Sequence, residues 1–294
     1  MENEPSRILY LYLSVKISVS SVARKMKGII IMKVGSTAYS YRKYLDSGEM
    51  TLEGFLDKAV ELGMDIVDLT SYYFKSTDIE YLNHIKKYAY LNGLDITGTA
   101  VGNSFTYKEA EKRATAVDLV KKWVDFSVIL SAPCIRVFAG GVPEGSSFEE
   151  AKGWTVQCLE ECLEYAKPKG VIIALENHGG ITSTADQVLS ILTAVGGSYL
   201  QERWLGTNLD LGNYRGDPYG NIEKAVPYAV TTHAKTDVFV EGIGRQDADF
   251  EKITQILHKA GYKGCLSIEY EGAEEPMTAM PKFVNYLKAC VSKL

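Results

Sequence analysis

The stretch VIIALENHGG (171–180) indicates the fold of the whole chain. Its first five residues are apolar and rich in β-branched side chains, as in a short buried strand. Glu176, Asn177 and His178 follow at once, and two glycines end the stretch. A buried strand that ends in polar side chains between helical segments is typical of an α/β fold whose functional site lies at the strand ends.

Similar strand–helix units occur on both sides of this stretch. The other predicted strands are KVGSTAYS (33–40), DIVDLT (65–70), DITGTAVG (95–102), CIRVFAG (134–140), LGTNLDLGN (205–213), TTHAKTD (231–237) and CLSIEYEG (265–272). Helical periodicity separates them: residues 51–64 place Leu52, Phe55, Leu56, Ala59 and Leu62 on one face, and residues 78–94 do so with Ile79, Leu82, Ile85 and Tyr88. Glycines such as Gly63 and Gly93 follow these helices, as C-cap residues do.

Eight such units of about 33 residues each predict a closed (β/α)8 TIM barrel that forms a single domain over residues 32–294. The alternative is an open, doubly wound sheet. Such a sheet usually has a glycine-rich phosphate-binding sequence after its first strand, and GSTAYS (35–40) does not match it.

The first 31 residues do not share this pattern. The apolar run Ile8 to Val15 follows Glu2 and Glu4, and Lys16 interrupts it. It is too short to cross a bilayer, which takes about 20 residues, and it lacks the positive start and cleavage site of a signal peptide. We therefore predict that residues 1–31 are a leader or N-terminal extension outside the fold. Export through a degenerate signal peptide is the alternative.

Composition excludes several classes of partner. Of 294 residues, 32 are Lys or Arg and 37 are Asp or Glu, so the net charge is −5, without the basic surplus of a nucleic-acid-binding protein. No stretch is long and apolar enough to predict a membrane span. The five cysteines have neither disulfide-framework nor zinc-finger spacing, which favours reduced thiols and a cytoplasmic location.

Four consecutive predicted strands, from the fifth to the eighth, each carry an Asp, Glu or His near their end: Glu176, Asp210, His233 and Glu269. Carboxylates at the ends of apolar strands need a partner, and a divalent cation at the barrel mouth would provide one. Three oxygens and one imidazole nitrogen suit Mn²⁺, Mg²⁺, Co²⁺ or Zn²⁺. The alternatives are that Glu176 pairs with a lysine such as Lys235, that Asp210 only forms a turn, that His233 is a core residue, and that Glu271 replaces Glu269.

The order of ALENHGG (174–180), LGTNLDLGN (205–213), THAKTD (232–237) and LSIEYEG (266–272) resembles the sugar phosphate isomerase/epimerase branch of the xylose isomerase-like barrel superfamily. The resemblance implies one divalent metal ion, with Mn²⁺ preferred, held by Glu176, Asp210, His233 and Glu269. It also implies that Glu176 and Glu269 exchange protons with a small sugar or polyol-derived substrate. Composition, as above, predicts no nucleic acid or membrane partner, and the resemblance allows a homo-oligomer.

The expected chemistry is proton abstraction next to a carbonyl through a metal-stabilised enediolate. The predicted catalytic residues are Glu176, Glu269, Lys235 and His178, and the predicted substrate-binding residues are Arg136, Asn208, Asn213 and Tyr72. Lys235 would hold a substrate oxygen or form an ion pair, and His178 would bind a hydroxyl or relay a proton. Arg136 would anchor the substrate or pair with a carboxylate. Further aromatic residues near the predicted mouth are Tyr39, Tyr41, Tyr73, Phe74, Phe105 and Phe138.

The sequence departs from one branch of this superfamily. Ketose 3-epimerases carry a histidine shortly after the strand-six aspartate and an arginine shortly after the strand-seven histidine. Here DLGNY (210–214) lacks that histidine, and no arginine follows His233 before Arg245. HAK (233–235) is closer to the H-x-K of inosose dehydratase-like members.

A lyase of the inosose dehydratase type, or one that cleaves 3-keto-glycosides by β-elimination, is therefore the alternative function. A carbohydrate-binding barrel without catalytic activity is less favoured, because a binder does not need paired glutamates around a cation. The endonuclease IV branch of the superfamily cuts DNA with a histidine-rich zinc site. This chain has only 4 histidines and a net charge of −5, which argues against that branch.

Overall fold

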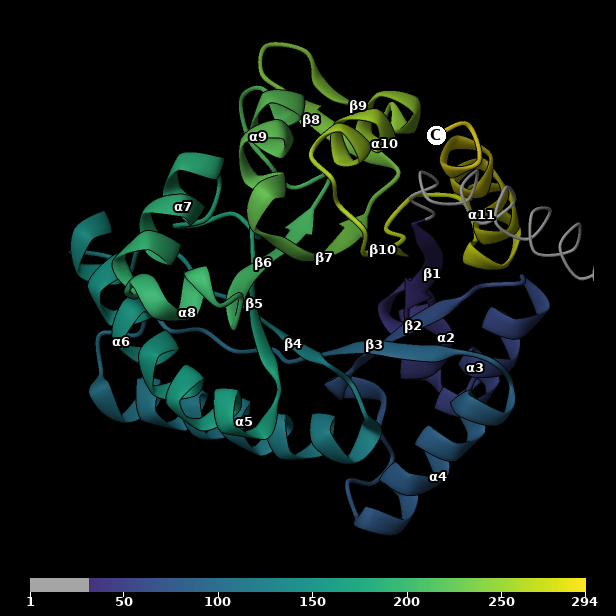
Figure 1. Ribbon diagram of the computed structural model, residues 1–294, viewed down its shortest axis with the longest axis horizontal. Coiled ribbons are helices and arrows are strands. Elements are labelled where there is room, and N and C mark those ends of the chain that lie inside the picture. The colour runs from purple at the N-terminus through teal and green to yellow at the C-terminus, as the bar shows by residue number, and fades with distance from the viewer. Residues whose placement is uncertain (1–31) are drawn as a thin grey trace, which may run out of the picture.

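The structure is a computed structural model that describes residues 32–294. Residues 1–31, for which the sequence predicts a leader or extension, lie outside the described residues. Among the described residues, the parallel strands are β1 (Lys33–Thr37), β2 (Ile66–Thr70), β3 (Asp95–Ala100), β4 (Cys134–Val137), β5 (Ile172–Glu176), β6 (Leu205–Asp210), β7 (Ala229–Ala234) and β10 (Cys265–Ile268). They close into a barrel in the order β1-β10-β7-β6-β5-β4-β3-β2, with helices around it (Figure 1). The predicted (β/α)8 barrel is thus confirmed.

The helices that cover the barrel are α2 (Arg42–Ser47), α3 (Leu52–Glu61), α4 (Ile79–Leu91), α5 (Ala110–Leu130), α6 (Phe148–Ala166), α7 (Ala185–Ala194), α8 (Gly197–Gln201), α9 (Pro218–Ala225), α10 (Phe250–Lys259) and α11 (Pro276–Val291). Short 3₁₀ segments lie at 38–41, 71–73, 167–169 and 226–228. Side chains of Thr51, Asp78, Ser147 and Thr184 cap four helices by accepting backbone N–H bonds. The apolar faces of these helices pack against the strands and form the core.

The parallel register brings the carboxyl ends of neighbouring strands to the same level. Glu176 of β5 lies opposite Asn208 of β6, and Asp210 of β6 lies opposite His233 of β7. His233 in turn lies opposite Ser267 of β10, two residues before Glu269. Polar residues that are far apart in the sequence are therefore collected at one end of the barrel.

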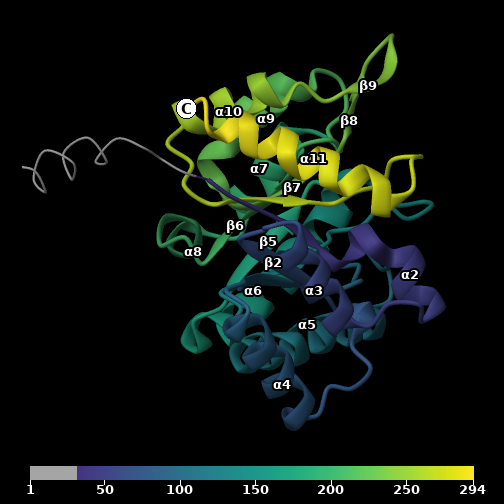
Figure 2. The same cartoon turned by 90° about the vertical axis from the view of Figure 1, so that its right-hand side faces the viewer.

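Most barrel strands end before the predicted residue, as β10 does at Ile268 rather than at 272, and the structure differs from the predicted elements in three further places. An antiparallel hairpin, β8 (Asp237–Val240) and β9 (Gly244–Asp247), projects from the barrel between β7 and α10 (Figure 2). The seventh barrel strand begins at residue 229 rather than 231. Ile79 is 66% exposed rather than on the buried face of its helix, because it is the first residue of α4 and precedes the turns that pack on the barrel.

The remaining features concern the cysteines and the helices. All five cysteines are free, as their spacing predicts, and all five are buried. Across residues 32–294, no helix has the length and apolar character that a bilayer crossing requires.

Candidate metal centre

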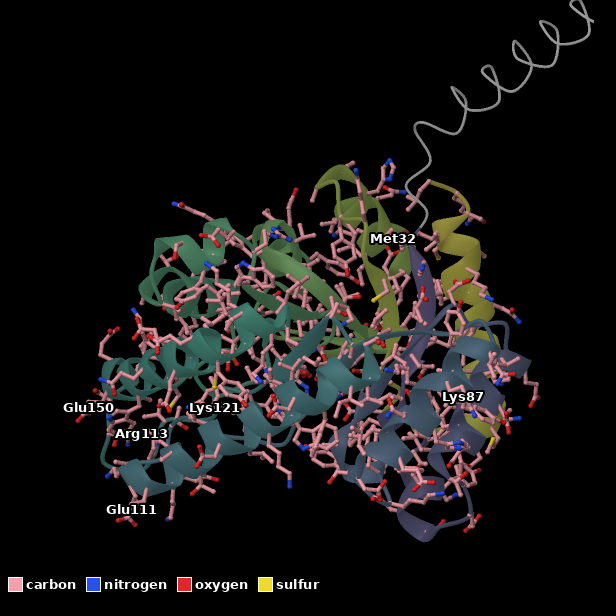
Figure 3. The ribbon with its side chains drawn as sticks, turned by 60° about the horizontal axis from the view of Figure 1, so that its bottom comes forward. Met32, Lys87, Glu111, Arg113, Lys121 and Glu150 are labelled. Carbon is pink, nitrogen blue, oxygen red and sulfur yellow. The ribbon has the colours of Figure 1, made fainter. Side chains whose placement is uncertain are left out.

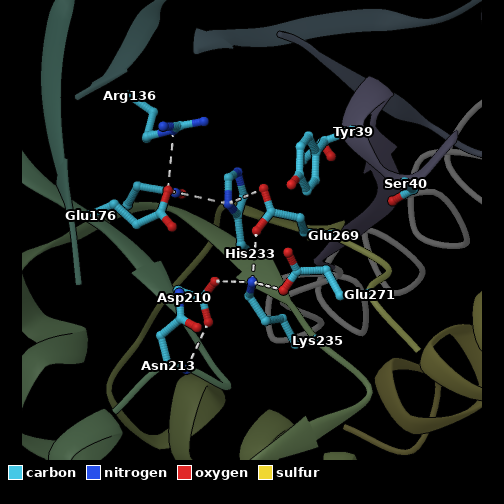
Figure 4. Close-up of polar contacts among 12 residues, drawn as sticks. Tyr39, Ser40, Arg136, Glu176, Asp210, Asn213, His233, Lys235, Glu269 and Glu271 are labelled. Carbon is cyan, nitrogen blue, oxygen red and sulfur yellow. Dashed lines mark hydrogen bonds and ion pairs between the residues drawn. The ribbon is translucent and has the colours of Figure 1, made fainter. Parts of the chain in front are cut away.

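Four side chains meet at the carboxyl ends of β5, β6, β7 and β10 (Figure 4). Glu176, Asp210, His233 and Glu269 are all buried, and each offers a ligand atom within 4.8 Å of the others. Among residues 32–294 this is the one group of three or more His, Cys, Asp or Glu side chains with such geometry. The structure thus brings together the four residues that the sequence predicts as metal ligands.

Asp210 divides its two carboxylate oxygens between a turn and the cluster. Its Oδ1 accepts the backbone N–H groups of Gly212 at 2.8 Å and Asn213 at 2.9 Å, so Asp210 does form the Asx turn considered above. Its Oδ2 is buried without a hydrogen-bond partner. Burial raises the pKa of Asp210 to about 7, against the opposing effect of Lys235. A buried oxygen without a donor favours either protonation or a cation.

Glu176 is held by two neighbours on the same side of its carboxylate. Its Oε2 accepts from Asn208 Nδ2 at 2.9 Å and lies 3.1 Å from Arg136 Nε. Arg136 also donates to the Val101 carbonyl at 3.1 Å, and its guanidinium lies over the Phe138 ring. The other oxygen of Glu176, Oε1, is buried without a hydrogen-bond partner and remains free for a cation or a substrate.

His233 lies between the two glutamates. Its Nδ1 is 3.3 Å from Glu269 Oε1 and 3.5 Å from Glu176 Oε2, and it forms no hydrogen bond. Burial works against its protonation, but Glu269 and Glu176 outweigh burial and raise the pKa of His233 to about 9. The imidazolium therefore supplies positive charge to this cluster when no metal ion does.

Lys235 contacts three carboxylates at once. Its ammonium lies 3.0 Å from Glu269 Oε2 and 3.6 Å from Asp210 Oδ2, and it also pairs with Glu271. Burial opposes the charge of Lys235, yet the three carboxylates raise its pKa. Burial would likewise raise the pKa of Glu269, but His233 and Lys235 hold it well below its usual value. Glu269 therefore stays ionised at neutral pH.

Comparison with known proteins identifies the family. Residues 56–290 match the family described as xylose isomerase-like TIM barrel. The chain belongs to this family.

Relatives and solved structures are similar over most of their length. An uncharacterized protein of Methanocaldococcus jannaschii is 21% identical over 289 residues, which cover 92% of this chain and 94% of that protein. A 3-keto-D-glucoside 4-epimerase from E. coli is 15% identical with a TM-score of 0.70, covering 88% of this chain and 100% of that one. A D-psicose 3-epimerase from Clostridium cellulolyticum H10 is 17% identical with a TM-score of 0.67, covering 89% and 97%. At these identities the similarity establishes the barrel.

The other predicted site residues of this xylose isomerase-like barrel differ in burial and in the residues that they contact. Asn208 is fully buried and donates to Glu176 Oε2 at 2.9 Å, and its contact with a substrate stays a prediction. Asn213 lies beside Asp210 with a buried, unpartnered Nδ2. His178 is exposed, and its ring lies against the Phe138 ring at 4.3 Å between centroids with an interplanar angle of 41°. Tyr72 is 52% exposed and packs edge-on beside Tyr73.

The aromatic residues that the sequence predicts near the mouth differ in where they lie. Tyr41 and Phe105 are fully buried in the core and do not line the mouth. Tyr39 follows β1 and lies beside Glu269 and Glu271 (Figure 4). Burial, together with those two carboxylates, raises the pKa of Tyr39 above its ordinary value.

Asn177, to which the sequence pattern gives no role, positions Asp210. Asn177 is fully buried, and its Nδ2 donates to the Asp210 carbonyl at 2.9 Å. The Asp210 N–H donates to Asn177 Oδ1 at 2.8 Å. The two bonds tie the segment after β5 to the end of β6. The sequence signal was an amide placed directly after a ligand candidate, in LEN (175–177).

Proposed function

We propose that this protein is a divalent-metal-dependent isomerase or epimerase of a sugar or sugar derivative. The observation that carries the proposal is the gathering of four buried side chains, Glu176, Asp210, His233 and Glu269, whose ligand atoms lie within 4.8 Å of one another. Three atoms of this group, Glu176 Oε1, Asp210 Oδ2 and His233 Nδ1, are buried without a hydrogen-bond partner. Buried polar atoms without hydrogen bonds are costly, and a cation bound by this group would offset that cost.

The donor set fits a divalent ion. Three carboxylates and one imidazole suit Mn²⁺ best among the candidates Mn²⁺, Mg²⁺, Co²⁺ and Zn²⁺, because the set mixes hard oxygen ligands with one nitrogen. When bound, the ion would act as a Lewis acid toward a substrate carbonyl and its neighbouring hydroxyl, and would make the adjacent C–H more acidic. The remaining steps belong to the side chains of the chain.

Glu176 and Glu269 are the proposed proton-transfer residues. They come from β5 and the end of β10, with β6 and β7 between them, so they approach a substrate from different sides. One carboxylate takes the proton from carbon and leaves an enediolate. The other returns a proton to the opposite face of that carbon, which gives an epimer, or to the neighbouring carbon, which gives an isomer. No atom is gained or lost.

Neighbouring groups prepare these two glutamates for that role. Arg136 and Asn208 contact Glu176 Oε2 and fix the carboxylate, while its Oε1 is buried without a hydrogen-bond partner. His233 and Lys235 hold the pKa of Glu269 low, so that it is ionised before substrate arrives. Lys235 would also stabilise negative charge on a substrate oxygen. His178, at the exposed edge, is proposed as a hydroxyl-binding or proton-relay residue.

The proposed substrate is a small sugar or polyol derivative. Support comes from the structures that share the barrel, which include a 3-keto-D-glucoside 4-epimerase and a D-psicose 3-epimerase.

A lyase is the second candidate, and the position of Lys235 favours it. The Lys235 ammonium lies 3.0 Å from Glu269 Oε2, so in this reading its positive charge would stabilise a leaving oxygen of a substrate bound beside Glu269. The same proton abstraction would then be followed by cleavage of the bond between the next carbon and its oxygen. The products would be an unsaturated ketone and water or an alcohol.

The test is exchange of substrate carbon-bound protons with D₂O in the presence of Mn²⁺. A panel of ketoses, inososes and 3-keto-glycosides is incubated with wild type, with Glu176→Gln, and with Glu161→Gln as a control, since Glu161 pairs with Lys121 far from the site. We expect exchange into one substrate class that is lost in Glu176→Gln and kept in Glu161→Gln. An isomeric product identifies an epimerase or isomerase, and an eliminated product a lyase. Absence of exchange by Mn²⁺-loaded wild type across the panel would contradict the proposal.

A further inference from the structure

Glu271 lies just outside the four proposed ligands and is connected to them through Lys235. Its carboxylate pairs with the Lys235 ammonium, while 37% of its side chain stays exposed. Glu269, two residues earlier, is only 7% exposed and contacts the same ammonium at 3.0 Å. Lys235 therefore joins a carboxylate of the proposed ligand set to a carboxylate that is not part of it (Figure 4).

The charges around the site show what Glu271 adds. With the proposed ligands ionised, Glu176, Asp210 and Glu269 carry three negative charges, and the buried Arg136 and Lys235 that contact them carry two positive charges. This leaves a charge of −1 around a neutral His233. Adding Glu271 makes the total −2, which a divalent cation neutralises.

We propose that Glu271 is a positioning residue that sets the affinity of the site for a divalent cation by holding and neutralising Lys235. The inference rests on the proposed function. The Lys235 ammonium stands beside two ligand carboxylates, so it repels a cation bound there and competes for the same oxygens. Glu271 pulls the ammonium from the other side and offsets its charge. Without Glu271, Lys235 is free to pair more closely with Asp210 and Glu269.

The two members of the pair should act in opposite directions on cation binding. Glu271→Gln removes the offsetting charge, and we expect Mn²⁺ to bind about tenfold more weakly or worse. Lys235→Gln removes the repelling charge, and Mn²⁺ should bind about tenfold more tightly. The double variant should bind Mn²⁺ within about threefold of wild type, because the pair is neutral as a unit. Glu271→Asp, which keeps the charge, should recover most of the affinity that Glu271→Gln loses.

The measurement is calorimetric titration of chelator-treated protein with Mn²⁺, without substrate, together with circular dichroism to verify folding. The matched control is the Lys121–Glu161 pair between α5 and α6, at 2.6 Å on the outer surface (Figure 3 labels Lys121). Lys121→Gln and Glu161→Gln each break an ion pair without touching the site, so Mn²⁺ affinity should not change. Should Lys235→Gln fail to fold, the comparison of Glu271→Gln with Glu271→Asp decides.

Two results would overturn the inference while leaving the proposed function intact: unchanged Mn²⁺ affinity in Glu271→Gln, or weaker Mn²⁺ binding in a folded Lys235→Gln. The second would show that Lys235 supports the ligand set instead of opposing the cation. If wild type itself binds no Mn²⁺, the proposed function fails, and the inference fails with it.

Discussion

Replacing Asn177 by alanine tests whether the cluster depends on the link between β5 and β6. The substitution removes both side-chain bonds to the Asp210 backbone, at 2.8 and 2.9 Å, in a place without solvent exposure. The Asp210 N–H donates to the side-chain oxygen Oδ1 of Asn177, an acceptor that alanine lacks. We expect a loss of stability together with looser positioning of Asp210.

The size of the stability loss follows from the two bonds. A buried backbone group left without its partner costs about 1–3 kcal/mol, so two groups cost roughly 2–6 kcal/mol. A water molecule that enters the space of the lost amide would place the result in the lower half of this range. For a chain of this length, each kcal/mol corresponds to roughly 2–4 °C in melting temperature. The expected decrease is therefore about 4–16 °C.

The assay is thermal unfolding followed both by far-ultraviolet circular dichroism and by tryptophan fluorescence. Asn92→Ala is the control, since Asn92 donates a single exposed bond to the Tyr88 carbonyl at 2.9 Å and should cost little. A melting temperature of Asn177→Ala equal to that of Asn92→Ala would refute the reasoning. So would a stability loss in which Mn²⁺ affinity remained at the wild-type value.

Two further predictions concern the loops and the thiols. Gly180→Ala should lower the free energy of unfolding by about 1–3 kcal/mol more than Gly179→Ala does. Both glycines have positive φ, but only a Cβ at Gly180 would meet the Gly140 carbonyl oxygen, at 2.2 Å. Equal urea midpoints for the two variants would contradict this prediction. Burial raises the pKa values of Cys158 and Cys265 to about 11, and all 5 cysteines are buried. The native protein should therefore not react with a thiol reagent at pH 8, whereas all 5 cysteines should react in urea. Rapid reaction of the native protein would contradict this prediction, because it would show an exposed thiolate.

The sequence predicts the barrel because the strand–helix period is regular and the strand ends carry polar residues. Glu176, Asp210, His233 and Glu269 could be chosen together because parallel strands place their carboxyl ends at the same edge, whatever the details of packing. That these four side chains lie together could therefore be predicted without knowing any individual contact.

Other features depend on contacts that a linear pattern does not show. The pairing of Arg136 with Glu176 results from the register between β4 and β5, in which Arg136 lies opposite Ala174. The role of Asn177 depends on the neighbouring strand in the same way. The hairpin of β8 and β9 was missed because its second strand, GRQD (244–247), is short and polar and has no buried face.

The central claim is that the four side chains hold one divalent cation, and the most direct test is Mn²⁺ stoichiometry in wild type and in Asp210→Asn. The amide oxygen can still accept the turn N–H groups that Asp210 Oδ1 accepts, so this variant removes the charge and keeps the turn acceptor. We predict one Mn²⁺ per chain for wild type and at least about tenfold weaker binding for a folded Asp210→Asn. Wild type that binds no divalent cation, or Asp210→Asn that binds as tightly as wild type, would contradict the account.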